Sequence, residues 1–140
     1  MLTNNRDAYR DTFFAAWDKY KRKLPLEPVE NQIVSAIQLH PEYHSLLEKP
    51  SMYCRQEFAL EENPFFHLSL HIAINEQIAT NRPTGMKDLY QNAITQQSAH
   101  DVLHQMMGCL AEMMSIAQQR GEMPGDLEYL NLLRLKVIVE

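Results

Sequence analysis

The chain has 140 residues, of which 45% are hydrophobic and 22% are charged, and its formal net charge is -5. These values are ordinary for one globular domain, so we predict a single domain over residues 1–140. No apolar run is long enough for a membrane-spanning helix, and the acidic balance disfavours nucleic acid as a partner. Because the stretch "MLTNNRDAYRDTFF" has no signal-peptide layout, we expect a cytoplasmic protein.

Helical periodicity runs through nearly the whole chain. Apolar residues at helical spacing predict a first helix that Asn4 or Asn5 caps and that ends near Lys23. Prolines, glycines and capping residues then divide the chain into further helices. The predicted segments are 28–39, 41–49, 64–80, 85–95, 99–120 and 126–135, with 50–62 as a loop or a single turn. Strand signals are almost absent, so the fold class is all-α, a helical bundle of about six or seven helices.

Three short motifs predict where individual helices begin and end. Asn63 and Pro64 form a helix start, because asparagine supplies a capping oxygen and proline fits the first helical position. Ser98, followed three residues later by Asp101, resembles a capping box. Gly121 is suited to end that helix.

All six histidines fall into pairs with a spacing of four residues. Such residues differ in direction by only about 40° around a helix, so both imidazoles of a pair point the same way. A pair therefore offers two metal ligands from one rigid element, and a facing helix in a bundle offers more. The pairs are His40 with His44, His67 with His71, and His100 with His104.

These pairs predict a transition-metal site, with zinc or iron as the ion. The segment 64–80 is apolar on all sides, which predicts a buried helix whose polar groups need partners. Pro41 interrupts the first pair, so its spacing carries less geometric meaning. The predicted ligands are His67, His71, His100 and His104, with His44 and Glu112 in support and Asn75 as a hydrogen-bond partner of a ligand.

Several alternatives stay open on the sequence alone. The histidines are also suited to hydrogen bonds inside a core without any cofactor and, as a lesser alternative, to acid–base chemistry or ligand binding without metal. The chain also fits a non-enzymatic interaction module, in which the methionines of "QMMGCLAEMM" form a homodimer face or, more simply, fill the core. Zinc-protease, phosphate-loop and nucleophile-elbow motifs are absent, so the sequence assigns no reaction.

Cys54 and Cys109 are too few for a disulfide framework. Cys54, beside Arg55, is a minor candidate for a reactive thiol.

Four longer stretches, "HPEYHSLLEKP", "NPFFHLSLHIAINEQ", "RPTG" and "HDVLHQMMGCLAEM", resemble a family of small bacterial proteins. This family is catalogued as domain of unknown function family eighteen-forty-one, and the likeness also covers "RDAYRDTFFAAWDKY". The resemblance implies a single cytoplasmic bacterial domain without an assigned activity. All six histidines, Cys109 and Glu112 fall within the signature segments, and the family gives them no role. The terminal "LKVIVE" is less typical of it.

Overall fold

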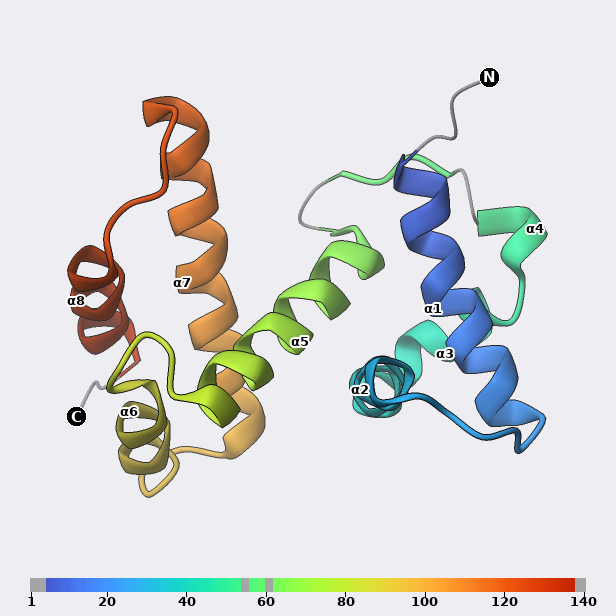
Figure 1. Cartoon of the computed structure of the whole chain (residues 1–140), viewed down its shortest axis with the longest axis horizontal. Coiled ribbons are helices and arrows are strands. Elements are labelled where there is room, and N and C mark those ends of the chain that lie inside the picture. Colours follow the sequence, from blue (N-terminus) through green and yellow to red (C-terminus); the bar gives the residue numbers. More distant parts are fainter. Residues whose placement is uncertain (1–4, 54–55, 60–61, 138–140) are drawn as a thin grey trace. The chain divides into compact units, whose positions relative to one another are not determined.

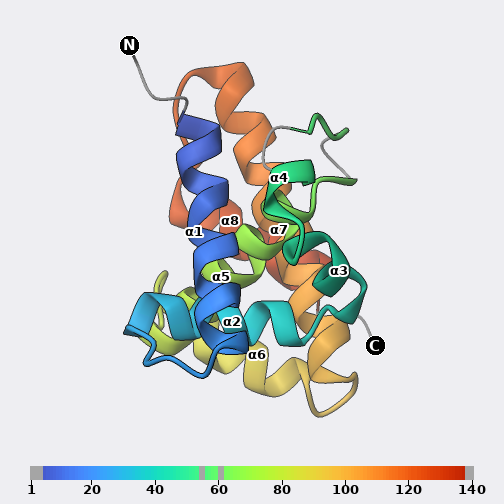
Figure 2. The ribbon, with the colours of Figure 1, turned by 90° about the vertical axis from the view of Figure 1, so that its right-hand side faces the viewer.

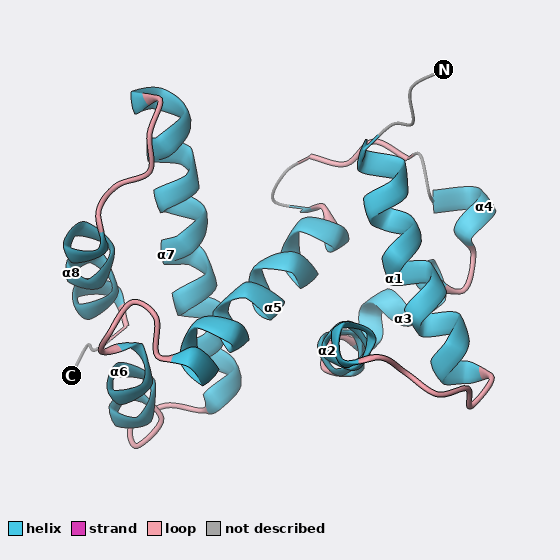
Figure 3. Ribbon diagram, viewed as in Figure 1, coloured by secondary structure: helices cyan, strands magenta, loops and turns pink. Residues whose placement is uncertain are grey.

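The structure is a computed structural model that describes residues 5–53, 56–59 and 62–137. In this part of the chain all regular structure is helical, which confirms the all-α prediction (Figures 1 and 3). The elements are α1 (Asn5–Lys21), α2 (Pro28–Gln38), the 3₁₀ turn η1 (Pro41–Tyr43), α3 (His44–Leu47), α4 (Pro50–Tyr53), α5 (Pro64–Thr80), α6 (Met86–Ala93), α7 (Ala99–Arg120) and α8 (Asp126–Lys136). The chain divides into two compact units, with the boundary between Ile72 and Ala73, inside α5.

The described residues hold eight α-helices, so the predicted count of six or seven is too low. The additional helix is α4, a single turn that begins at Pro50. Proline is well suited to a first helical position, but one turn is too short to produce a hydrophobic period in the sequence. The predicted helix 41–49 is also divided, because a 3₁₀ turn after Pro41 precedes α3.

Unit 1 folds around an aromatic and aliphatic core that α1, α2 and the start of α5 share. Figure 2 shows α1 running across α2. Phe65 of α5 meets the rings of Phe13 and Phe14 edge to face, with centroids 5.8 and 5.6 Å apart. The buried members of this core are Phe13, Phe14, Ala16, Trp17, Ile33, Val34, Ala36, Ile37, Leu47, Phe65 and Leu68.

Arg10 is a buried cation within unit 1, with 2% of its surface exposed. Its guanidinium lies 4.7 Å from the centroid of the Phe65 ring and donates to the backbone carbonyl of Gln56 at 2.7 Å. A buried charge is tolerated when hydrogen bonds and aromatic faces replace water. Arg10 therefore ties the segment after α4 to the beginning of α5.

Unit 2 contains the second part of α5 with α6, α7 and α8, and α7 packs against α8. The Ser98 side chain accepts a hydrogen bond from the Asp101 backbone N–H, and Gly121 adopts the left-handed conformation (φ 85°) that closes α7. Both predicted ends of this helix are thus confirmed. Of the four methionines in its sequence, Met106, Met107 and Met113 are buried, which favours the core-packing interpretation, whereas Met114 is 41% exposed.

Among the residues described, no helix combines the length and the apolar character needed to cross a membrane. Cys54 lies outside the described residues, as does the end of the terminal "LKVIVE" segment. Val137, the last residue that the structure describes, is fully buried.

The Asn63 cap is expected to stabilise the start of α5. Its side-chain oxygen accepts from the backbone N–H groups of Phe65 at 2.9 Å and Phe66 at 3.2 Å. We expect Asn63→Ala to lower the free energy of unfolding by about 1 kcal/mol, the usual value for a lost capping bond. Urea denaturation measures this, with Asn31→Ala at an exposed position of α2 as the matched control. Equal unfolding free energies for the two variants would contradict the capping role.

Candidate functional site

His40 leaves the path of α2 because Pro41 follows it. A residue before proline avoids the helical region of backbone space, and His40 adopts φ -129° and ψ 72°. Its side chain folds back against α2, where the Nδ1–H donates to the carbonyl oxygen of Ala36 at 2.8 Å. The imidazole is almost completely buried, with 1% of its surface exposed. A carbonyl oxygen only accepts, so this bond fixes the proton of a neutral His40 ring on Nδ1.

The second nitrogen of His40 meets His67 of α5. The two Nε2 atoms lie 3.0 Å apart, and the ring centroids lie 4.7 Å apart at an interplanar angle of 81°. Since Nδ1 of His40 carries the proton, its Nε2 presents a lone pair to His67. This contact is either an N–H···N hydrogen bond from His67 or one edge of a coordination sphere in which both nitrogens face a cation.

His71 and Tyr43 complete the group of rings around His40. His71, one turn after His67 on α5, is fully buried, and its centroid lies 5.4 Å from that of His40 at 88°. The Tyr43 ring stacks on His40 with centroids 5.5 Å apart and lies edge-on to His67. Burial, and to a lesser extent the charge of Glu42, raises the pKa of Tyr43, so its phenol stays protonated at neutral pH. We call His40, His67 and His71 the histidine cluster of unit 1.

The dimensions of the His40–His67 contact match those of two histidine ligands on one metal ion. Two imidazole nitrogens that bind one zinc ion at about 2.0–2.1 Å are separated by roughly 2.9 Å at a right angle and roughly 3.3 Å at the tetrahedral angle. The observed separation of 3.0 Å falls in this interval. The corresponding ring centroids would lie roughly 4.5–5.2 Å apart. The His40–His67 centroid distance of 4.7 Å lies in this range, whereas the His40–His71 centroid distance of 5.4 Å lies outside it.

His44 occupies a different environment. Its Nε2–H donates to the carbonyl oxygen of Ile37 at 2.9 Å, and its ring packs on Trp17 with centroids 4.7 Å apart. These contacts join η1 and α3 to α2 and α1. The structure therefore gives His44 a packing role in unit 1.

The pair His100 and His104 belongs to unit 2. The two rings lie on the first turns of α7 with centroids 4.1 Å apart, as the spacing of four residues predicts. His100 is exposed and His104 is half-buried. Since His67 and His71 belong to unit 1, the predicted convergence of the two pairs stays a prediction.

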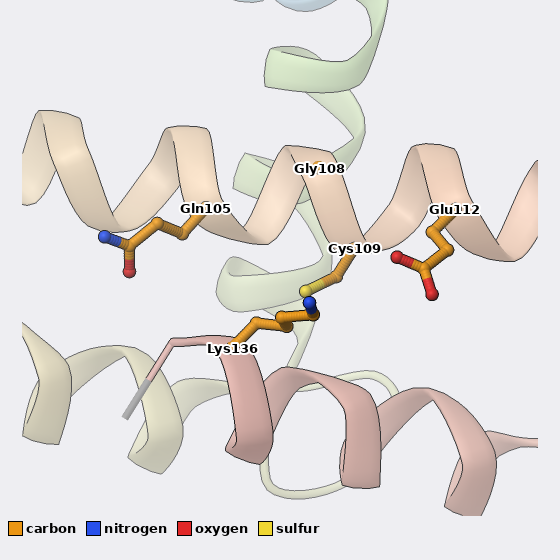
Figure 4. A pocket seen from close by; sticks show the side chains of 5 residues that line it. All are labelled: Gln105, Gly108, Cys109, Glu112 and Lys136. Carbon is orange, nitrogen blue, oxygen red and sulfur yellow. The ribbon is translucent and has the colours of Figure 1, made fainter. Parts of the chain in front are cut away.

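The remaining sequence candidates also lie in unit 2. Asn75 is exposed on α5. Glu112 lines a cavity of about 330 Å³ together with Gln105, Gly108, Cys109 and Lys136 (Figure 4). Burial raises the pKa of the Cys109 thiol to about 11; Glu112 adds to the rise and Lys136 opposes it. At neutral pH Cys109 is therefore a protonated, weakly nucleophilic thiol.

His40 is the residue that spacing did not select. The spacing argument compares positions along one helix, whereas His40 meets a histidine 27 residues away on another element. The available signal was Pro41, since a histidine that leaves a helix before a proline is free to turn its ring toward a neighbouring element.

The family described as "Domain of unknown function (DUF1841)" matches residues 5–135. The match spans nearly the whole chain, so the chain belongs to this family, as the resemblance of its histidine-containing segments indicated. No curated protein and no solved structure matches the chain.

The chemistry of Cys109 yields a prediction for thiol labelling. A Cys54→Ala variant leaves Cys109 as the only cysteine. With a pKa near 11 in place of the ordinary 9.0, its thiolate fraction at pH 8 is about a hundredfold smaller than in the unfolded chain. We expect iodoacetamide to alkylate the native protein correspondingly more slowly than the protein in urea, as followed by mass spectrometry. Similar rates in the two conditions would show that the thiol is neither buried nor raised in pKa.

Proposed function

We propose that this DUF1841 protein binds a transition-metal ion through the histidine cluster of unit 1. The observation that carries the proposal is the 3.0 Å separation of His40 Nε2 and His67 Nε2. The Nδ1–H of the same His40 ring donates to the carbonyl oxygen of Ala36. Histidine ligands in metalloproteins usually donate their other N–H to a carbonyl or carboxylate in this way, which orients the ring and fixes its tautomer. His40 and His67 are the primary ligands, and His71, whose ring lies further from His40, is the candidate for a third.

Zinc is the ion that this ligand set favours over iron. All three donors are imidazoles, which suit zinc, whereas the common non-haem iron site combines two histidines with a carboxylate. Three protein nitrogens leave one position of a tetrahedral zinc ion for water or another ligand. We assign no reaction to that position.

Metal analysis tests the proposal. Protein purified without a histidine tag is expected to contain a stoichiometric metal ion by inductively coupled plasma mass spectrometry. We expect His40→Ala and His67→Ala each to lose it, because either change removes one of the two nitrogens at the 3.0 Å contact. The matched control is His44→Gln, since His44 bonds to the Ile37 carbonyl and is expected to leave the metal content unchanged.

A thermal assay separates loss of the site from loss of the fold. Zinc added to metal-free wild type is expected to raise the melting temperature, because an ion that binds only the native state stabilises it by about 2.7 kcal/mol at a hundred times Kd. Folded His67→Ala protein is expected to show no zinc-dependent shift. Wild-type protein without metal and with an unchanged melting temperature in zinc would overturn the proposal.

His100→Ala and His104→Ala in the same assays test the prediction that the second pair supplies ligands.

A second proposal is a non-enzymatic module that forms homodimers through α7, α8 and the segment between them. It is supported by four large apolar side chains of unit 2 that are exposed by 41 to 69%, namely Met114, Met123, Leu127 and Leu135. Sedimentation velocity over a range of protein concentrations tests it. A concentration-dependent dimer that Leu127→Glu disrupts is the expected result, and a monomer at every concentration would contradict it.

A further inference from the structure

The cavity beside α7 and α8 in unit 2 carries two opposite charges at separate places. Figure 4 shows the Lys136 ammonium reaching over the Cys109 sulfur, with the Glu112 carboxylate further along α7. Among the salt bridges between described residues, none joins these two side chains. Their separation leaves each charge available to a ligand on the same side of the helix pair.

Gly108 lies on the solvent-exposed side of this cavity. A Cβ placed on Gly108 would meet no atom within 4 Å, so space lies directly above the α7 backbone at this position. The cavity volume of about 330 Å³ is enough for a small molecule of the size of an amino acid.

Two consecutive hydrogen bonds between amide groups fix the end of α8, which forms one side of the cavity. Gln105 Nε2 donates to Gln97 Oε1 at 2.6 Å, and Gln97 Nε2 donates to the carbonyl oxygen of Val137 at 3.0 Å. Val137 follows Lys136 directly and is fully buried. These bonds fix the backbone next to Lys136 relative to α7, so the two charged side chains project from rigid elements.

From this arrangement we propose that the cavity binds a small zwitterion of the α-amino acid class, with the ligand carboxylate on Lys136 and the ligand ammonium on Glu112. A simple anion would be attracted by Lys136 but repelled by Glu112. A simple cation would be attracted by Glu112 but repelled by Lys136. Only a ligand with both charges gains from both side chains, so electrostatic complementarity selects a zwitterion.

Cys109 forms an apolar part of the same cavity. Its side chain is buried, and at neutral pH it is a protonated thiol that contacts the ligand without reacting with it. The site is therefore one of recognition. Since Glu112 and Lys136 are both exposed and screened by water, we expect binding in the millimolar range.

The test is a titration of ¹⁵N-labelled protein with L-alanine, followed through the amide signals of Gly108 and Cys109. Saturable shifts are expected with alanine, and much weaker binding is expected with acetate or methylamine, each of which offers only one charge. Glu112→Gln and Lys136→Gln are each expected to weaken alanine binding about tenfold, the effect of losing roughly 1.4 kcal/mol. Glu122→Gln and Lys87→Gln, at exposed positions of the same unit, are the matched controls.

A charge exchange makes the test specific. Glu112→Lys alone or Lys136→Glu alone places two like charges at the cavity, which is expected to abolish alanine binding. The double variant restores one charge of each sign and is expected to recover most of the affinity with the ligand reversed. The proposal is overturned if wild-type protein shows no saturable shift, if acetate binds as tightly as alanine, or if the single exchanges bind alanine like wild type.

Discussion

The hydrogen bond from His40 Nδ1 to the carbonyl oxygen of Ala36 is the constraint on which the candidate site depends. It decides which nitrogen of His40 faces His67, because the carbonyl accepts a proton that only Nδ1 is placed to donate. Pro41 makes this bond possible by ending α2 and turning His40 back along it. Without this turn His40 would continue the helical path. The lone pair at the 3.0 Å contact thus follows from a single backbone feature.

Much of the fold was predictable because its determinants are local. The Asn63 cap, the Ser98 cap and the Gly121 terminus each depend on a few neighbouring residues, and the structure confirms all three. The α4 turn was not separated from the loop because four residues show no period. The site was predicted only in part. Spacing correctly gives paired rings on one helix, as at His100 and His104, but it carries no information about which element faces which.

His40 and His44 show why spacing alone misleads. The two residues form a pair with the expected interval, yet one ring folds back along α2 toward His67 and the other bonds to the Ile37 carbonyl and packs on Trp17. The difference arises from Pro41, which lies between them and breaks the helical geometry that the interval assumes. A spacing of four residues therefore places two rings on the same face only where the intervening residues permit a continuous helix, as in α5 and α7.

A hydrogen bond between His40 and His67 alone is a weak reason for placing two imidazoles together. The net contribution of a neutral hydrogen bond is about 0.5–1.5 kcal/mol, and replacing both partners with apolar side chains of similar shape is often nearly neutral. Burial of His40 next to His71, which is also fully buried, adds the desolvation of further polar atoms. An ion shared by these rings would offset that cost through coordination bonds that apolar side chains cannot replace. The double variant His40→Phe with His67→Leu distinguishes the two explanations. If the pair is purely structural, the free energy of unfolding is expected to stay close to that of the wild type. If the pair binds metal, the stabilisation by added zinc is expected to be lost.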